Sequence, residues 1–256
     1  MSTESSKDPR QNFAPRILPW LLAAAAFAIY LVTLNRWVSL FNLAAVTKIS
    51  GRTWQPDVLN PVLFLFTAPF RLLPAAAVPL ALNIFSAVCA AVTLGLLARV
   101  VALLPHDRTH AQRTREHSGF SFLTIRAAWL PPVLAAIVCG WQLSFWESAT
   151  NFTGETFDLL PFALVIWLLA EYRLDERVGR LFLAAFIYGA GMAENYALVG
   201  FFPVFIIALI WMRGKSFFNL GFLARMTMGG LAGLLFFLLL PTLAVISGKV
   251  PGAYWW

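Results

Sequence analysis

The sequence predicts an all-α polytopic membrane protein with about seven transmembrane helices and a large first outer loop. Three observations lead to this fold class: 60% of the 256 residues are hydrophobic, only 12% are charged, and the apolar residues form long continuous runs. A helix of about 20 apolar residues crosses the hydrocarbon core of a bilayer and satisfies its own backbone hydrogen bonds there. Soluble domains usually contain about a quarter charged residues.

The chain starts with a polar segment and a first apolar run. Residues 1–16 carry three basic side chains and are expected to form a cytoplasmic tail, while residues 17–34 are long enough to span the bilayer. Four prolines interrupt residues 35–77, which are expected to form the first outer loop. Within this loop, residues 62–73 are apolar but too short to cross, which predicts a short interfacial helix.

Six further apolar runs are predicted to span the membrane: residues 78–104, 127–145, 156–172, 181–192, 196–212 and 226–246. Residues 105–126 are expected to form a basic cytoplasmic loop. Under this topology 14 of the 19 Lys and Arg residues lie on the N-terminal side and 5 on the other, so the N-terminus is predicted to be cytoplasmic. Residues 17–256 are therefore expected to form one transmembrane domain, at the start of a longer protein.

Acidic residues converge on the outer side under this topology. Carboxylates beside a bilayer are costly unless they face water, a partner or a ligand, so they are candidates for function. Glu155 and Asp158 are three residues apart and would share one face of a helix. Glu155 also fits a structural role in the first turn of a helix capped by Thr153, and both interpretations stay open. The acids concerned are Asp57, Glu147, Glu155, Asp158 and Glu194.

Other classes of site are not indicated by the sequence. The net charge of +7 is spread over short loops and forms no solvated basic domain, so nucleic acid is not expected as a partner. Cys89 and Cys139 fall inside apolar runs without the spacing of a metal site. No cofactor is identified, and a divalent metal near the outer acids is left open.

Several segments, taken in order, resemble a known family. They read YLVTLNRWVSL at 30–40, NPVLFLFTAPFRLLP at 60–74, ALNIFSAVCAAVTLGLLARVV at 81–101, FWESATNFTGETFDLL at 145–160 and YGAGMAENYALVGFFPVF at 188–205. This set resembles the N-terminal portion of protein O-mannosyltransferase-like membrane proteins of the GT-C glycosyltransferase superfamily, in particular their bacterial branch. The resemblance implies transfer of a sugar from a polyprenyl-phosphate donor to a protein or glycan acceptor, outside the cytoplasm, in a bacterial inner membrane.

The resemblance also suggests site residues. The acceptor hydroxyl needs a carboxylate that takes its proton, for which the catalytic candidates are Asp57 and Glu155. Asp57 is the acid left in the first outer loop, although it equally fits a turn residue after Pro56. The expected substrate-binding residues are three arginines for the lipid phosphate and four polar residues near the outer helix ends: Arg36, Arg52, Arg71, Glu147, Asp158, Glu194 and Asn195.

One segment departs from the family pattern. Relatives begin the first outer loop with an aromatic-Asp-Ser-Gly-Glu pattern, whereas this chain has WVSLF at 37–41 and neither acid. Altered or lost catalysis is therefore an open alternative. Two other classes also stay open, namely an ion-coupled transporter that uses the outer acids and a non-catalytic membrane scaffold.

Overall fold

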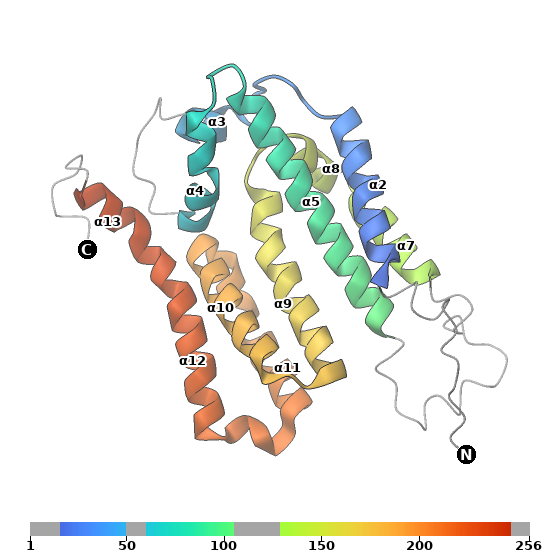
Figure 1. The fold of residues 1–256 in the computed structure, drawn as a ribbon, viewed down its shortest axis with the longest axis vertical. Coiled ribbons are helices and arrows are strands. Elements are labelled where there is room, and N and C mark those ends of the chain that lie inside the picture. The colour runs from blue at the N-terminus through green and yellow to red at the C-terminus, as the bar shows by residue number, and fades with distance from the viewer. Residues whose placement is uncertain (1–15, 50–59, 105–128, 247–256) are drawn as a thin grey trace, which may run out of the picture.

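The computed structural model describes residues 16–49, 60–104 and 129–246, and every regular element in these ranges is a helix (Figure 1). The first part contains α2 (Leu18–Val32), α3 (Leu43–Ile49), α4 (Pro61–Thr67), η1 (Ala68–Leu72) and α5 (Val78–Leu103). The middle part contains α7 (Leu130–Gly140), α8 (Leu143–Thr150), α9 (Glu155–Asp175) and α10 (Val178–Glu194). The last part contains η4 (Tyr196–Phe201), α11 (Phe202–Arg213), η5 (Gly214–Phe218), α12 (Leu220–Leu234), η6 (Leu235–Leu238) and α13 (Leu239–Ile246).

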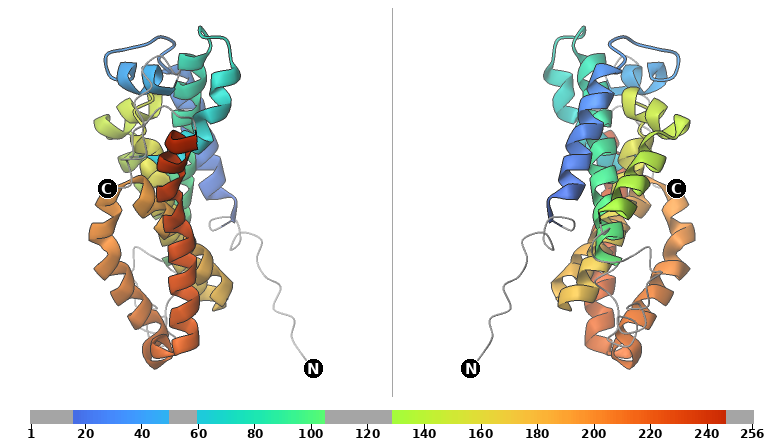
Figure 2. Two further views of the ribbon diagram at one scale, coloured as in Figure 1. Left: turned by 90° about the vertical axis from the view of Figure 1, so that its left-hand side faces the viewer. Right: turned by 90° about the vertical axis from the view of Figure 1, so that its right-hand side faces the viewer.

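The longer helices form a row in which each packs on the next, in the order α2, α5, α9, α10 and α12 (Figure 1). α5 also contacts the short helices α7 and α8. α11 lies beside this row: η5 joins it to α12 at one end of the molecule, and the two helices diverge toward the other end (Figure 2).

α5 is the helix around which the first half of the chain packs. It is apolar around its whole circumference, a pattern typical of a helix that is buried on most sides. Leu82, Ala87 and Ala90 have no exposed surface. Two polar residues of α5, Asn83 and Ser86, are also buried, and both make hydrogen bonds to the segment around the start of α9.

Glycines allow α10 and α12 to approach each other closely. A Cβ atom at Gly189 of α10 would lie 2.1 Å from the backbone oxygen of Gly230, and one at Gly233 of α12 would lie 2.2 Å from that of Phe186. Both distances are far below van der Waals contact. Small residues at such crossings let two backbones pack directly, as is common between membrane helices.

Residues 146–155 were expected to connect two spans on the outer side, and the structure shows mostly helix there. α8 and α9 form a bent pair with an angle of 112° between them, and only residues 151–154 are non-helical. Gly154 turns the chain with a φ of +95°, a conformation that L side chains rarely adopt. The predicted span 127–145 is likewise divided, because α7 ends at Gly140 and α8 begins at Leu143.

Buried side chains of α5 hold this bend in place. The Asn83 Oδ1 atom accepts a hydrogen bond of 2.8 Å from the Phe152 N–H. Ser86 Oγ donates to the Ser148 carbonyl at 2.6 Å and lies 2.8 Å from Thr156 Oγ1. Two backbone groups at the break, the Phe152 N–H and the Ser148 carbonyl, are thus paired within the protein, as irregular backbone near a membrane interior requires.

The segment predicted to form the first outer loop begins on the same bend. Asn83 Nδ2 donates to the Asn35 carbonyl at 2.7 Å, and Asn35 Nδ2 donates to Asn151 Oδ1 at 2.8 Å. Asn42 is fully buried and donates to Asn83 Oδ1 at 3.3 Å. These four asparagines join the segment after α2, the helix α5 and the α8–α9 break into one polar network.

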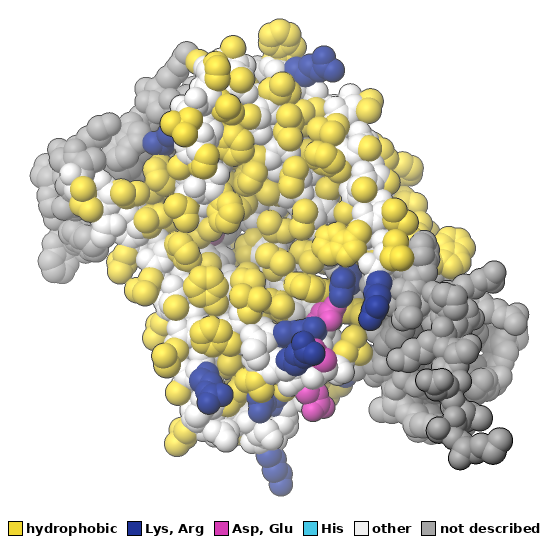
Figure 3. Space-filling model, in the orientation of Figure 1, with side chains coloured by type: hydrophobic (Ala, Val, Ile, Leu, Met, Phe, Trp, Pro, Cys, Tyr) yellow, Lys and Arg dark blue, Asp and Glu magenta, His cyan; other side chains and the backbone are white. Residues whose placement is uncertain are grey.

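Membrane character is visible in helix length and surface composition. Among the residues that the structure describes, three segments are long and apolar enough to cross a bilayer, and a fourth is added if the α8–α9 pair counts as one span. The three are Val78–Leu103, Tyr196–Phe218 and Leu220–Leu243. Apolar side chains cover most of the face in Figure 3, whereas Lys and Arg gather toward its lower end. The chain therefore has the helices of an integral membrane protein.

The span count by length is lower than the predicted seven. Within the described residues α2 and α7 are shorter than a full span, and α10 is a 17-residue helix. α9 reaches span length only together with five charged residues near its ends, Glu155, Asp158, Glu171, Arg173 and Asp175. The apolar segment predicted as an interfacial helix is present as the short helices α4 and η1.

Candidate functional site

Three carboxylates meet where α9 begins and α10 ends. Glu155 and Asp158 lie in the first turn of α9, and Glu194 is the last residue of α10. Asp158 is close enough to both glutamates for their negative charges to repel. Together with Asn195 these residues are called the acidic cluster below. Four residues expected to serve function are thus brought together from the start of α9 and the end of α10, and the two that bond directly, Asp158 and Asn195, are 37 positions apart in sequence.

Glu194 is the buried member of the cluster, with 3% of its surface exposed. Its Oε2 atom accepts hydrogen bonds from the Val62 N–H at 2.7 Å and the Leu63 N–H at 3.1 Å. These are free amides in the first turn of α4, whose N-terminal end meets the ends of α9 and α10 (Figure 1). The second oxygen, Oε1, is buried and has no hydrogen-bond partner among the described residues.

Burial dominates the electrostatics of Glu194. Removal from water raises the pKa of its carboxyl from 4.5 to about 7. The two backbone amides oppose this rise because they stabilise the ionised form, whereas the neighbouring Asp158 adds to it. Glu194 lies beyond residues 181–192, the apolar run predicted to span. A group with this pKa changes protonation near neutral pH.

Asp158 is held by a side-chain amide. Asn195 Nδ2 donates to Asp158 Oδ2 at 2.7 Å, while Asn195 Oδ1 accepts from the Ala197 N–H at 2.9 Å. The second bond places the amide nitrogen toward Asp158. The other carboxylate oxygen, Oδ1, is buried without a partner among the described residues. Buried polar atoms are nearly always paired in folded proteins, so two such oxygens in one cluster suggest a ligand or proton.

Glu155 is the exposed member of the cluster. Ser148 Oγ, from the last turn of α8, donates to Glu155 Oε2 at 2.6 Å. The alternative interpretation as part of a helix cap is only partly correct, because Gly154 occupies the capping position and Thr153 Oγ1 accepts a long 3.4 Å bond from the Glu155 N–H. Glu155 thus combines a place in the first turn with a side chain open to a ligand.

The other predicted site residues either lie away from the acidic cluster or fall outside the described residues. Arg52 and Asp57 fall outside the described residues. Arg36 is exposed in the segment after α2. Arg71 is fixed by a 2.9 Å bond from its Nε to the Ile49 carbonyl and by its position 4.8 Å from the Phe64 ring centre.

Glu147 lies in α8 and is half-buried, and its backbone oxygen accepts from Asn151. Its side chain makes no hydrogen bond or ion pair to the other described residues. No group of three or more His, Cys, Asp or Glu in the described ranges is arranged to bind a metal.

Sequence reasoning missed the partners that fix the cluster. Ser148 and the amides of Val62 and Leu63 belong to no motif. Ser148 reaches Glu155 from α8, and the two amides reach Glu194 from α4. One signal was present: Asn60-Pro61 opens a helix, because proline is favoured in the first turn, where backbone N–H groups lack partners. The free N–H groups at a helix start can donate hydrogen bonds to a buried carboxylate, but only the fold brings the two together.

Comparison with known proteins gives one family. A family model described as "Protein O-mannosyl-transferase TMEM260 N-terminal domain" matches residues 60–217. The matched region runs from the start of α4 to η5 and contains the whole acidic cluster. No curated protein and no solved structure matches the chain.

Proposed function

The chain belongs to the protein O-mannosyl-transferase TMEM260 N-terminal domain family, and from this premise we propose that it is the membrane portion of a glycosyltransferase that attaches mannose to a hydroxyl oxygen of a protein. The donor is a polyprenyl-phosphate sugar, and the reaction takes place on the outer side of a bacterial inner membrane. The GT-C superfamily and a seven-span topology with a cytoplasmic N-terminus are parts of the same proposal.

The observation that carries the proposal is the acidic cluster inside the matched region. In this transfer the acceptor oxygen attacks the anomeric carbon, the bond from that carbon to the phosphate oxygen breaks, and the lipid phosphate leaves. The acceptor's proton goes to a carboxylate, a role worth about 10²- to 10⁴-fold in rate. An exposed carboxylate beside a half-buried one and a buried one is suited to this step.

Glu155 is the proposed proton acceptor among the described residues. It is exposed, Ser148 holds one of its oxygens, and Oε1 has no partner in the described part of the chain. Asp158 shares the first turn of α9 with it, and Glu194 in turn lies next to Asp158. Asp57 of the first outer loop is the second candidate for the same role.

Arginines of the first outer loop are proposed to bind the leaving phosphate. Guanidinium groups pair with phosphate oxygens through two parallel hydrogen bonds. Arg36 is exposed, and Arg71 uses its Nε for the Ile49 carbonyl, which holds the rest of its guanidinium in a fixed position. Arg52 is the third candidate.

A second function, ion-coupled transport, is favoured by one observation. The α8–α9 pair is a discontinuous helix, and such helices form the ion sites of many secondary transporters. The unpaired oxygens of Asp158 and Glu194 lie next to this break and are suited to a proton or cation. The two functions can be told apart, because only a glycosyltransferase transfers a labelled sugar to protein.

The test is a transfer assay with membranes that contain the full-length protein. A polyprenyl-phosphate mannose labelled in the sugar is added, and label in protein is measured before and after alkaline β-elimination, which releases sugars from serine and threonine oxygens. The proposal predicts alkali-labile label. If no label reaches protein from this or any other polyprenyl-phosphate sugar, and the protein drives ion flux in proteoliposomes, the transporter function is favoured instead.

A further inference from the structure

The end of the molecule opposite the acidic cluster is rich in arginine. α9 ends here, α10 begins, and α11 passes through η5 into α12 (Figure 1). Some of this charge is neutralised within the protein. Arg99 and Arg180 each bond to Glu171, at 2.8 and 2.7 Å, and Arg180 also pairs with Asp175 at 2.9 Å.

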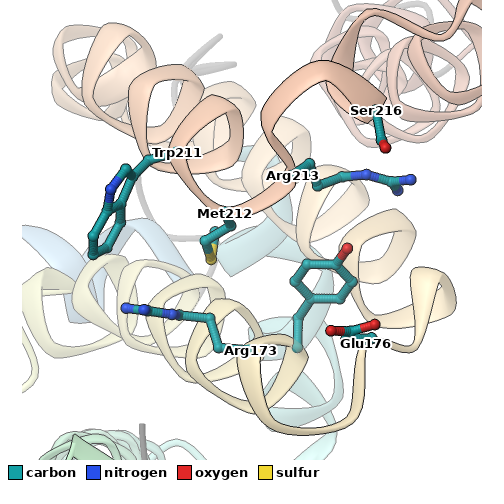
Figure 4. Close-up of a pocket in the computed structure, with 7 residues that line it drawn as sticks. Arg173, Glu176, Trp211, Met212, Arg213 and Ser216 are labelled. Carbon is teal, nitrogen blue, oxygen red and sulfur yellow. The ribbon is translucent and has the colours of Figure 1, made fainter. Parts of the chain in front are cut away.

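A cavity of about 410 Å³ lies beside this ion-pair network. Its walls come from the last turn of α9, the end of α11 and η5, as Figure 4 shows. Sites for small ligands usually have volumes of about 300–1,000 Å³. The lining residues are Tyr172, Arg173, Glu176, Trp211, Met212, Arg213 and Ser216.

Positive charge dominates this cavity. Of the lining residues, Arg173 and Arg213 carry guanidinium groups and Glu176 carries a carboxylate. Arg213 forms no ion pair with a carboxylate of the described residues: its guanidinium lies 4.0 Å from the Phe222 ring centre, and its Nη1 atom is buried without a hydrogen-bond partner there. Arg173 lies over the Trp211 ring at 4.6 Å. Arg213 and Ser216 lie on the same side of the cavity in Figure 4.

The cavity lies at the level expected for lipid headgroups. It is at the C-terminal end of the candidate span Tyr196–Phe218 and just before the start of Leu220–Leu243. Trp211 is 73% exposed at this end, and tryptophan is enriched at the boundary between lipid and water. A headgroup in the adjoining leaflet would therefore meet the arginines without leaving its bilayer.

We propose that this cavity binds the phosphate of an anionic phospholipid. Arg213 and Arg173 supply the positive charge, and the hydroxyl groups of Ser216 and Tyr172 supply neutral donors to the phosphate oxygens. The acyl chains lie along the apolar outer face of α11, where Ile207 and Val204 are exposed. Basic pockets between membrane helices are known as sites for acidic headgroups. This site is independent of the proposed sugar transfer.

The test measures lipid binding by the purified full-length protein. Native mass spectrometry in detergent compares retention of phosphatidylglycerol with that of phosphatidylcholine in wild type and in Arg213→Gln. We expect the wild type to prefer phosphatidylglycerol, and Arg213→Gln to bind it roughly tenfold to hundredfold more weakly, because a charge-assisted bond pair is lost. Arg213→Lys keeps the charge and should recover part of the affinity.

The matched control is Arg225→Gln, which removes the same charge from an exposed position on α12 that does not line the cavity. It should bind phosphatidylglycerol like wild type. Equal losses in Arg213→Gln and Arg225→Gln would mean general charge attraction and would overturn the proposal. Inorganic phosphate that competes at the same concentration as the lipid would also overturn it, because the ligand would then be free phosphate.

Discussion

Glu194, the last residue of α10, links the packed long helices to the segment predicted as the first outer loop. Its carboxylate accepts hydrogen bonds from two amides of α4 and lies next to Asp158 of α9, so this side chain of α10 connects three helices. The sequence predicted that Glu194 and Asp158 belong to a site, because charged residues near membrane helices seldom occur without a function, and the family resemblance added Asn195. It did not predict the amide partners, because they are backbone atoms more than 130 residues away.

Replacing Glu194 with Ala is expected to lower stability by about 1–3 kcal/mol, since two buried amides lose their acceptor. Gln keeps an oxygen that can accept from the same amides and should cost less. Thermal unfolding in detergent, followed by tryptophan fluorescence, measures both. An Ala variant that unfolds at the wild-type temperature would show that the amides find another acceptor.

The pH dependence of stability should also reflect Glu194. Because burial raises its pKa from 4.5 to about 7, the folded protein binds this proton more tightly than the unfolded chain. Its favourable contribution is complete below pH 4.5 and is lost as pH rises to about 7. Wild type should therefore lose more stability over this range than Glu194→Gln. Parallel pH profiles for the two proteins would contradict this.

At the level of elements, continuous apolar runs predicted the helices well and their interruptions poorly. α5, α10 and α12 overlap the runs expected at 78–104, 181–192 and 226–246. The segment between α8 and α9 was predicted to connect two spans, because it lies between the apolar runs 127–145 and 156–172. The buried side chains of Asn83 and Ser86, on a helix distant in sequence, show that the break is packed inside the protein.

The close crossing of α10 and α12 gives a prediction at this scale. Gly233→Ala places a Cβ atom 2.2 Å from a backbone oxygen of α10, so the helices must separate. We expect a loss of about 1–3 kcal/mol, typical of overpacking, seen as a lower unfolding temperature in detergent. Gly200→Ala is the control, because a Cβ there meets nothing within 4 Å. Equal behaviour of the two variants would show that the helices do not pack in this way.

At the level of the whole molecule, composition predicted an all-helical membrane protein, and this is confirmed in its coarse form by the helices and their apolar surface. The number of spans could not be counted from hydropathy alone. α9 carries charged residues near both ends, and α7 and α8 divide an apolar run into two short helices. The acidic end and the arginine-rich end are separate because α9 begins with Glu155 and Asp158 and carries Arg173 in its last turn, while α10 ends at Glu194. The order of charged residues between the apolar runs indicated this separation.

The orientation in the membrane is testable with reporter fusions. The seven-span topology puts Arg115 in the cytoplasm and Lys249 outside, because basic residues concentrate on the N-terminal side. Alkaline phosphatase and green fluorescent protein fused after each of these residues should give opposite results. If both positions report the same side, the acidic cluster and the arginine-rich end need a new assignment to the two faces.

The measurement that tests the central claim most directly is the rate of mannose transfer by Glu155→Gln in membranes with the full-length protein. The substitution preserves shape and removes the proton acceptor, so the rate should fall by roughly 10²- to 10⁴-fold. Asp57→Asn is measured beside it as the rival candidate, and Glu116→Gln, in the predicted cytoplasmic loop, controls for loss of a carboxylate and should transfer like wild type. If Glu155→Gln transfers mannose at the wild-type rate, the acidic cluster is not the catalytic site.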